Sequence, residues 1–99
     1  MIRAVVTKNR VSLSGHAGYA PAGQDIVCAA VSALVFALAE AAEQRGGVRE
    51  LVIRPGRVTV AVKEDCADYL RVAVCGLHQL AARYPQCVAV EGQELRIKS

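Results

Sequence analysis

Tryptophan is absent from the sequence and phenylalanine occurs once, although hydrophobic residues make up 54% of the 99 positions. With so few aromatic rings, the core has to be built from the aliphatic side chains of Val, Leu, Ile and Ala. A chain of this length fits one domain, and we expect residues 1–99 to form a single one. Because a small domain buries only a modest share of its surface, the aliphatic excess predicts a homodimer.

Runs of basic residues are also absent. The net charge is +3, and Lys and Arg are interspersed with acidic residues along the chain. Modules that bind nucleic acid usually gather Lys and Arg on one face. The dispersed charge is instead typical of a solvated surface, and we expect no direct binding of nucleic acid.

Signals for export and for membrane insertion are missing as well. Residues 1–6 lead straight into an alternating pattern rather than a secretory signal. The longest uncharged stretch, between Asp25 and Glu40, is shorter than the ~20 apolar residues of a membrane span. We therefore expect a cytoplasmic protein with no membrane partner, in which the four cysteines are thiols rather than disulfides.

The cysteines do not form a metal-binding motif, since no Cys-x-x-Cys occurs. Cys75 and His78 have a spacing that can hold a metal, but structural zinc needs four ligands, and only Cys66 and Cys87 lie nearby. His78 also falls away from the apolar stripe of its expected helix. We therefore interpret it as an ordinary exposed histidine and expect neither a metal nor another cofactor.

What the sequence does contain is a pattern of short strands and two longer helical stretches. Alternation of apolar and polar residues indicates the strands, and apolar residues at helical spacing indicate the helices. Asn9-Arg10 and Pro55-Gly56 are turn signals between strands. The predicted elements are strands at 2–8 and 11–15, a helix at 26–45, strands at 51–54 and 57–62, a helix at 65–84 and a strand within 87–98. This order, ββαββαβ, predicts an α+β two-layer sandwich in which two helices cover one face of a mostly antiparallel sheet.

The helix predicted at 26–45 has an uneven composition. Before Glu40 it is apolar nearly all round, and its charged residues come only after that point. A helix of this kind requires cover on every side, which again indicates a partner subunit.

A glycine-rich loop at 15–24 separates the second strand from this helix. If Asp25 is the N-cap of the helix, Cys28 occupies its first turn, where backbone N–H groups and the helix dipole stabilise a thiolate. A nucleophilic cysteine needs a base within hydrogen-bond reach. His16 lies at the other end of the loop, and folding of the loop back on itself would bring its imidazole to the thiol.

Both residues also have ordinary interpretations. A free cysteine in an apolar helix is most often a core residue, and a lone histidine in a loop is usually a polar surface group. The position of Cys28 in the first turn favours the catalytic interpretation, and so does the position of His16, which continues the polar face of Ser12 and Ser14.

Two further residues are supporting candidates. Asp25 is either a structural helix cap or the group that orients His16 as the third member of a triad. Ser32 lies one turn beyond Cys28 and could touch the site, although a hydroxyl in helix packing is the favoured interpretation. The N–H groups of the helix start, including that of Cys28, are candidates for an oxyanion hole.

The loop and the helix start together carry a specific pair of motifs. Gly-His-Ala-Gly-Tyr at 15–19, followed by Gly-Gln-Asp-Ile-Val-Cys-Ala-Ala-Val-Ser-Ala at 23–33, closely resembles the ribosomal-processing cysteine protease family. The resemblance implies that Cys28 attacks a peptide carbonyl while His16 takes the thiol proton, and that the protein is a homodimer. It also implies a substrate, the N-terminal extension of a large-subunit ribosomal protein, and a loop that orders over bound peptide. Pro21 and the mostly uncharged loop depart from many relatives, which leaves the peptide preference open.

A function from a different class remains as the alternative. Residues 15–18 also spell Gly-x-x-Gly, the backbone clamp of a KH RNA-binding module, although that clamp joins two helices and here a strand precedes it. The alternative is a non-catalytic ribosome- or RNA-associated binding protein.

Overall fold

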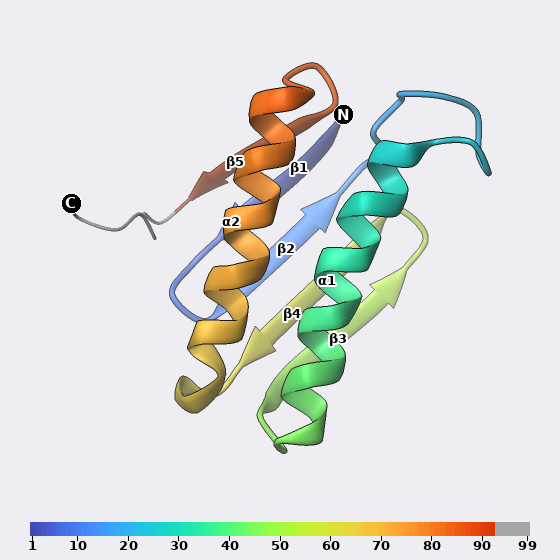
Figure 1. Cartoon of the computed structure of the whole chain (residues 1–99). Helices are drawn as coiled ribbons and strands as arrows, with labels where there is room; N and C mark the ends of the chain where they lie inside the picture. Colours follow the sequence, from blue (N-terminus) through green and yellow to red (C-terminus); the bar gives the residue numbers. More distant parts are fainter. Residues whose placement is uncertain (93–99) are drawn as a thin grey trace.

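The computed structural model describes residues 1–92 and forms one five-stranded sheet with two helices packed on one face (Figure 1). Its elements are β1 (Ile2–Val6), β2 (Arg10–Ser14), α1 (Ile26–Gln44), β3 (Val48–Arg54), β4 (Arg57–Val62), α2 (Ala67–Arg83) and β5 (Val88–Gly92). A short 3-10 turn, η1 (Glu64–Cys66), leads into α2. This is the predicted order ββαββαβ in an α+β two-layer arrangement, so the fold prediction is confirmed.

The strands lie in the order β3-β4-β2-β1-β5 across the sheet. Neighbouring strands are antiparallel except β1 and β5, which are parallel. The end of β2 and the turn between β3 and β4 lie at the same end of the molecule (Figure 1). The loop that follows β2 therefore starts beside this turn, and the N–H of Gly15 donates to the carbonyl oxygen of Gly56 at 3.0 Å.

Some boundaries differ from the predicted ones. β3 begins at Val48 rather than at residue 51, because an edge strand tolerates charged side chains and the register shift between Val48 and Glu50 accommodates them. The helix predicted from residue 65 begins as η1 and becomes α2 at Ala67. The last strand is described over Val88–Gly92, and the remainder of the predicted 87–98 segment lies outside the described residues.

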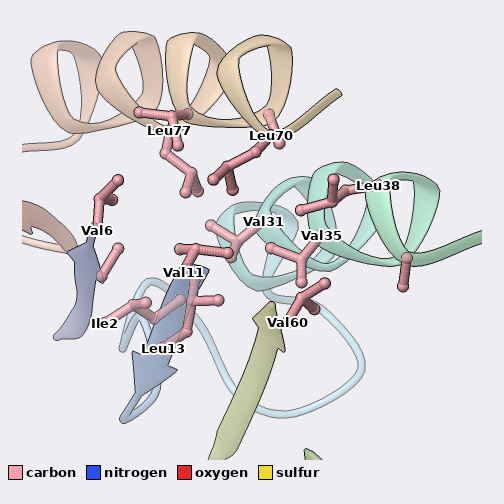
Figure 2. Close-up of a cluster of buried hydrophobic side chains, with 14 of the residues drawn as sticks. Ile2, Val6, Val11, Leu13, Val31, Val35, Leu38, Val60, Leu70 and Leu77 are labelled. Carbon is pink, nitrogen blue, oxygen red and sulfur yellow. The ribbon is translucent and has the colours of Figure 1, made fainter. Parts of the chain in front are cut away.

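The core lies between the helices and the sheet and is aliphatic, as the composition predicted (Figure 2). Leu70 and Leu77 of α2 and Val35 of α1 are almost completely buried and meet Val11 and Val60 from the sheet. Burying a side chain of this size stabilises the fold by roughly 1.5–3 kcal/mol. The packing of both helices against the sheet fixes where α1 begins, and α1 carries Cys28.

The outer face of the helices leaves apolar surface uncovered. Ala33 and Leu34 of α1 and Val72 and Gly76 of α2 line a hollow of about 740 Å³, and Val72 is 70% exposed. By length and composition alone α1 is long and apolar enough to cross a membrane, because the helix continues past Glu40. Its inner face nevertheless forms part of the core against the sheet, so α1 is an integral element of the two-layer fold.

Candidate active site

The loop before α1 starts from a glycine that no other residue can replace without rearrangement. Gly15 has a φ of 91°, and a Cβ at this position would overlap the carbonyl oxygen of Met1. Glycine adopts such a φ without steric cost. His16 is therefore presented from a fixed point, where the end of β2, the start of β1 and the β3–β4 turn meet.

The imidazole of His16 is exposed and lies beside the β3–β4 turn. A Cβ built on Gly56 would come within 3.4 Å of the Nε2 atom of His16. Gly56 itself has a φ of 70°, which the tight turn after Pro55 requires. The turn therefore forms a wall against one edge of the imidazole and limits where the ring can lie.

Cys28 lies in the first turn of α1, and Asp25 is the N-cap of this helix. The Oδ1 atom of Asp25 accepts hydrogen bonds from the N–H groups of Val27 at 3.0 Å and Cys28 at 2.9 Å. These bonds, that from Cys28 above all, hold the pKa of the Asp25 carboxyl below its ordinary value. The cap fixes the first helical turn and thereby the direction of the Cys28 side chain.

The second oxygen of Asp25 holds the loop. Its Oδ2 atom accepts a hydrogen bond from the N–H of Tyr19 at 3.1 Å. The ring of Tyr19 also meets the ring of Tyr84, edge to face, with centroids 5.6 Å apart. Within residues 1–92 the hydrogen bonds that Asp25 accepts come from backbone N–H groups, and none comes from His16. The structure thus places Asp25 as a helix cap that also anchors the loop.

The sulfur of Cys28 faces the loop. The N–H of Ala17 donates a hydrogen bond to the Cys28 Sγ atom at 3.3 Å, and Ala17 is only 3% exposed. Among the described residues, no hydrogen bond joins the imidazole of His16 to this sulfur. A direct contact between the imidazole and the thiol therefore stays a prediction.

His16 and Cys28 share two hollows on the surface. One, of about 290 Å³, opens toward the sheet, and its apolar lining includes Leu13, Phe36 and Ile53. The other, of about 610 Å³, lies under the loop between Gly18 and Asp25. Ser32 lines both hollows as well. The fold of the loop thus places His16, Cys28 and Ser32 along the same two hollows, and their catalytic and supporting roles stay predictions.

The surroundings of Cys66 and Cys75 differ from those of Cys28. Cys66 is buried, and its loss of hydration raises the pKa of its thiol. Cys75 is exposed on α2, as is His78. All four cysteines are free thiols, and within residues 1–92 no group of three or more His, Cys, Asp or Glu side chains could hold a metal ion.

The Gly-x-x-Gly run at 15–18 has a different setting from the KH clamp. It follows β2 and precedes α1, whereas the clamp of a KH module joins two helices. The glycines here shape the loop around the sulfur of Cys28.

Comparison with known proteins identifies the family of this chain. The family model described as cysteine protease Prp matches residues 1–89. A ribosomal processing cysteine protease Prp from Mycoplasma pneumoniae is 35% identical over 97 residues, which cover 94% of this chain and 96% of that protein. The chain belongs to the Prp family of cysteine proteases. It is accordingly a cysteine protease.

Solved Prp structures have the same fold. The essential ribosomal processing protease Prp from S. aureus, in complex with a covalently linked product peptide, matches with a TM-score of 0.80 at 19% identity, covering 93% of this chain and 97% of that one. A Streptococcus mutans protein matches with a TM-score of 0.77 at 28% identity, covering 94% of each chain. A second S. aureus Prp structure contains a substrate peptide and has a TM-score of 0.73.

Two elements of this candidate site were not predicted from the sequence. The N–H of Ala17 lies at the sulfur, and Gly56 lies against the imidazole. Ala17 makes its contact through the backbone N–H, which nearly every residue has, so the residue type does not indicate it. The contact between Gly56 and His16 joins positions far apart in the chain, and the turn signal at Pro55-Gly56 alone does not indicate it.

Proposed function

We propose that Cys28 is the nucleophile and His16 the general base of this protease. The substrate in this proposal is the N-terminal extension of a large-subunit ribosomal protein, removed in the cytoplasm during ribosome assembly. The observation that carries the proposal is that both side chains line the same two hollows, with Cys28 at the start of α1. A thiolate is the reactive form of cysteine, and a helix N-terminus favours it.

The chemistry follows from these two groups. His16 takes the thiol proton of Cys28, and the thiolate sulfur bonds to the carbonyl carbon of the scissile peptide. The tetrahedral intermediate collapses as the imidazolium returns the proton to the leaving amine. This leaves a thioester on Cys28. His16 then takes a proton from water, the hydroxide displaces the sulfur, and the acid product leaves as the thiol is restored.

The two hollows give the peptide a path across the site. In this proposal the peptide extends from one hollow to the other past Cys28, which lines both. The smaller hollow has an apolar lining, to which Phe36 and Ile53 contribute side chains that are 42% and 56% exposed. In this proposal it receives an apolar side chain next to the cleaved bond, because burial of such a group is favourable by roughly 1.5–3 kcal/mol.

The proposed ribosomal substrate is inferred from the relatives of this chain. The Mycoplasma pneumoniae protein is named for ribosomal processing, and the S. aureus structures contain a product peptide and a substrate peptide. The mild positive charge of this chain, +3, is compatible with work close to the ribosome without requiring contact with its RNA.

The quaternary state is part of the proposal. The hollow between α1 and α2 exposes apolar side chains of both helices, including Val72. A second copy of the chain would cover this face, and interfaces between permanent partners are rich in such apolar surface. Insertion of α1 into a membrane would instead remove Val31, Val35 and Leu38 from the core.

Cleavage of ribosomal proteins from the same genome tests the function. Purified enzyme, Cys28→Ala and Cys75→Ala are mixed with each large-subunit ribosomal protein in turn, and the products are identified by mass spectrometry. Cys75 is an exposed thiol on α2 and serves as the matched control. The expected result is one cut near the N-terminus of one substrate by the wild type and by Cys75→Ala, and none by Cys28→Ala.

Two outcomes contradict the proposal. One is the absence of any cut by a folded wild-type enzyme, and the other is cleavage that persists in folded Cys28→Ala. Salt-sensitive binding of ribosomal RNA that is unaffected by Cys28→Ala would favour the alternative function, a non-catalytic binding protein.

A further inference from the structure

Attack on a peptide carbonyl creates a negatively charged oxygen that the enzyme has to stabilise. In many enzymes with a nucleophile at a helix start, the free N–H groups of the first turn serve this purpose. Here the N–H groups of Val27 and Cys28 both donate to Oδ1 of Asp25, at 3.0 and 2.9 Å. The N–H of Ala29 donates to the carbonyl oxygen of Asp25 at 3.1 Å. Three of the helix-start amides that the sequence suggested, those of Val27, Cys28 and Ala29, are therefore already engaged.

A different backbone amide points at the reaction centre. The N–H of Ala17 lies 3.3 Å from the Sγ atom of Cys28. In the tetrahedral intermediate the sulfur and the oxyanion are bonded to the same carbon. A donor within hydrogen-bond reach of one is therefore placed to reach the other once the bond has formed.

The amide of Ala17 is held in place by the packing around it. The Ala17 side chain is 3% exposed and packs in the core, and Gly15 lies so close to Met1 that a Cβ there would overlap the Met1 carbonyl oxygen. Farther along the loop, the Oδ2 atom of Asp25 accepts a hydrogen bond from the N–H of Tyr19 at 3.1 Å. A donor fixed before the reaction costs no reorganisation as charge develops, and exclusion of water strengthens its effect.

We propose that the backbone N–H of Ala17 is the oxyanion-hole donor of this protease. In the resting enzyme it binds the sulfur of Cys28. When the carbon–sulfur bond forms, the electron pair of the carbonyl moves to oxygen, and the N–H of Ala17 donates to that oxygen without transferring its proton. The proposal rests on Cys28 being the nucleophile.

Replacement of one backbone amide by an ester tests the role of this single N–H. Cys28 is itself a ligation point: a synthetic 1–27 thioester can be joined to recombinant residues 28–99 to give the full chain. Lactic acid in place of Ala17 removes the N–H and retains the methyl side chain. The hydroxy-acid analogue of Lys8, in the exposed turn between β1 and β2, is the matched control. A chain of native sequence assembled by the same route is the reference.

Two reagents distinguish an effect on the oxyanion from an effect on the thiolate. Iodoacetamide alkylates sulfur without forming an oxyanion, whereas p-nitrophenyl acetate is attacked at a carbonyl. Both rates are measured at Cys28 as a function of pH and compared at full ionisation of the thiol. Modification of the exposed Cys75 in the same samples is the internal reference.

The expected result is a loss of acylation at Cys28 on the order of 10²-fold for the Ala17 ester, the usual effect of removing one oxyanion donor. Alkylation at full ionisation should stay close to that of the native chain, and the Lys8 ester should match the native chain in both reactions. An equal loss in both reactions would overturn the proposal, because the N–H would then act only on the sulfur. Unchanged acylation would also overturn it.

These outcomes are distinct from a failure of the proposed function. A native chain whose Cys28 is inert to both reagents would contradict the nucleophile assignment, and the oxyanion proposal with it. A native chain that reacts normally but cuts no ribosomal protein would contradict only the proposed substrate.

Discussion

The N–H of Tyr19 donates to Oδ2 of Asp25 at 3.1 Å, while the other oxygen of the same carboxylate caps α1. One side chain therefore joins the middle of the loop to the start of the helix that carries Cys28. The loop and Cys28 are positioned by the same group. A change at Asp25 should affect both, but to different extents for different substitutions.

Asp25→Asn should separate the two functions of this carboxylate. The amide oxygen of asparagine still caps a helix, but its NH₂ group cannot accept the hydrogen bond from Tyr19. We expect a melting temperature close to that of the wild type, faster limited proteolysis within 17–24 and reduced peptide cleavage. Asp25→Ala, which removes both contacts, should lower the melting temperature as well. Equal proteolysis rates for wild type and Asp25→Asn would show that Oδ2 does not hold the loop.

The anchor should also depend on pH. The pKa of Asp25 is lowered in the folded chain, chiefly by the N–H of Cys28, so its contribution to stability is present above the unfolded pKa of about 3.9. That contribution is lost as the pH falls through the lower folded value. The amide ¹⁵N chemical shift of Tyr19 should therefore titrate with a midpoint below about 3.9. The shift should show no such transition in Asp25→Asn, and a midpoint above the ordinary value would contradict the assignment.

Gly56→Ala should impair catalysis beyond its effect on stability. The new Cβ would lie 3.4 Å from Nε2 of His16, at a φ of 70° that alanine disfavours. Gly46→Ala is the matched control, since Gly46 has a φ of 69° and a Cβ there would meet nothing within 4 Å. Each change should cost about 1–2 kcal/mol of folding stability. Only Gly56→Ala should shift the pH profile of kcat/KM, and equal profiles would rule out the positioning role.

The proposed homodimer gives a prediction on the outer face of the helices. Val72→Asp places a charge in the apolar hollow between α1 and α2 and should convert the dimer to a monomer. Val5→Asp is the control, because Val5 is 44% exposed and pairs with Ser12 on the open face of the sheet. Light scattering after size-exclusion chromatography measures the mass. A monomeric wild type at micromolar concentration, or a dimeric Val72→Asp, would contradict the proposed interface.

Much of the fold could be predicted from local signals. The Pro55-Gly56 turn, the Asp25 cap and the alternation of Val11 and Leu13 with serines each act over a few residues, and the structure agrees with all three. The start of β3 could not be predicted in this way. At a sheet edge, Arg49 is exposed and the half-buried Glu50 pairs with Arg10 at 2.9 Å, so the apolar alternation that marks a strand is missing there.

Only the reactive side chains of the candidate site could be predicted from the sequence. His16 and Cys28 belong to residue types whose chemistry suggests catalysis, and the capped helix start indicated where Cys28 would lie. The contribution of Ala17 is a backbone N–H, and that of Gly56 is the absence of a side chain beside an imidazole. Such contributions depend on how the loop and the β3–β4 turn meet in space, which neither segment encodes alone.

Detection of the covalent intermediate tests the central claim most directly. Enzyme mixed with its peptide substrate is quenched in acid during turnover, and its intact mass is recorded. The account predicts an adduct equal to the N-terminal product minus water, located on Cys28 by digestion and absent from Cys28→Ala, with Cys75→Ala behaving as the wild type. Cleavage without any such adduct at any quench time, or an adduct on another residue, would contradict the assignment of Cys28 as the nucleophile.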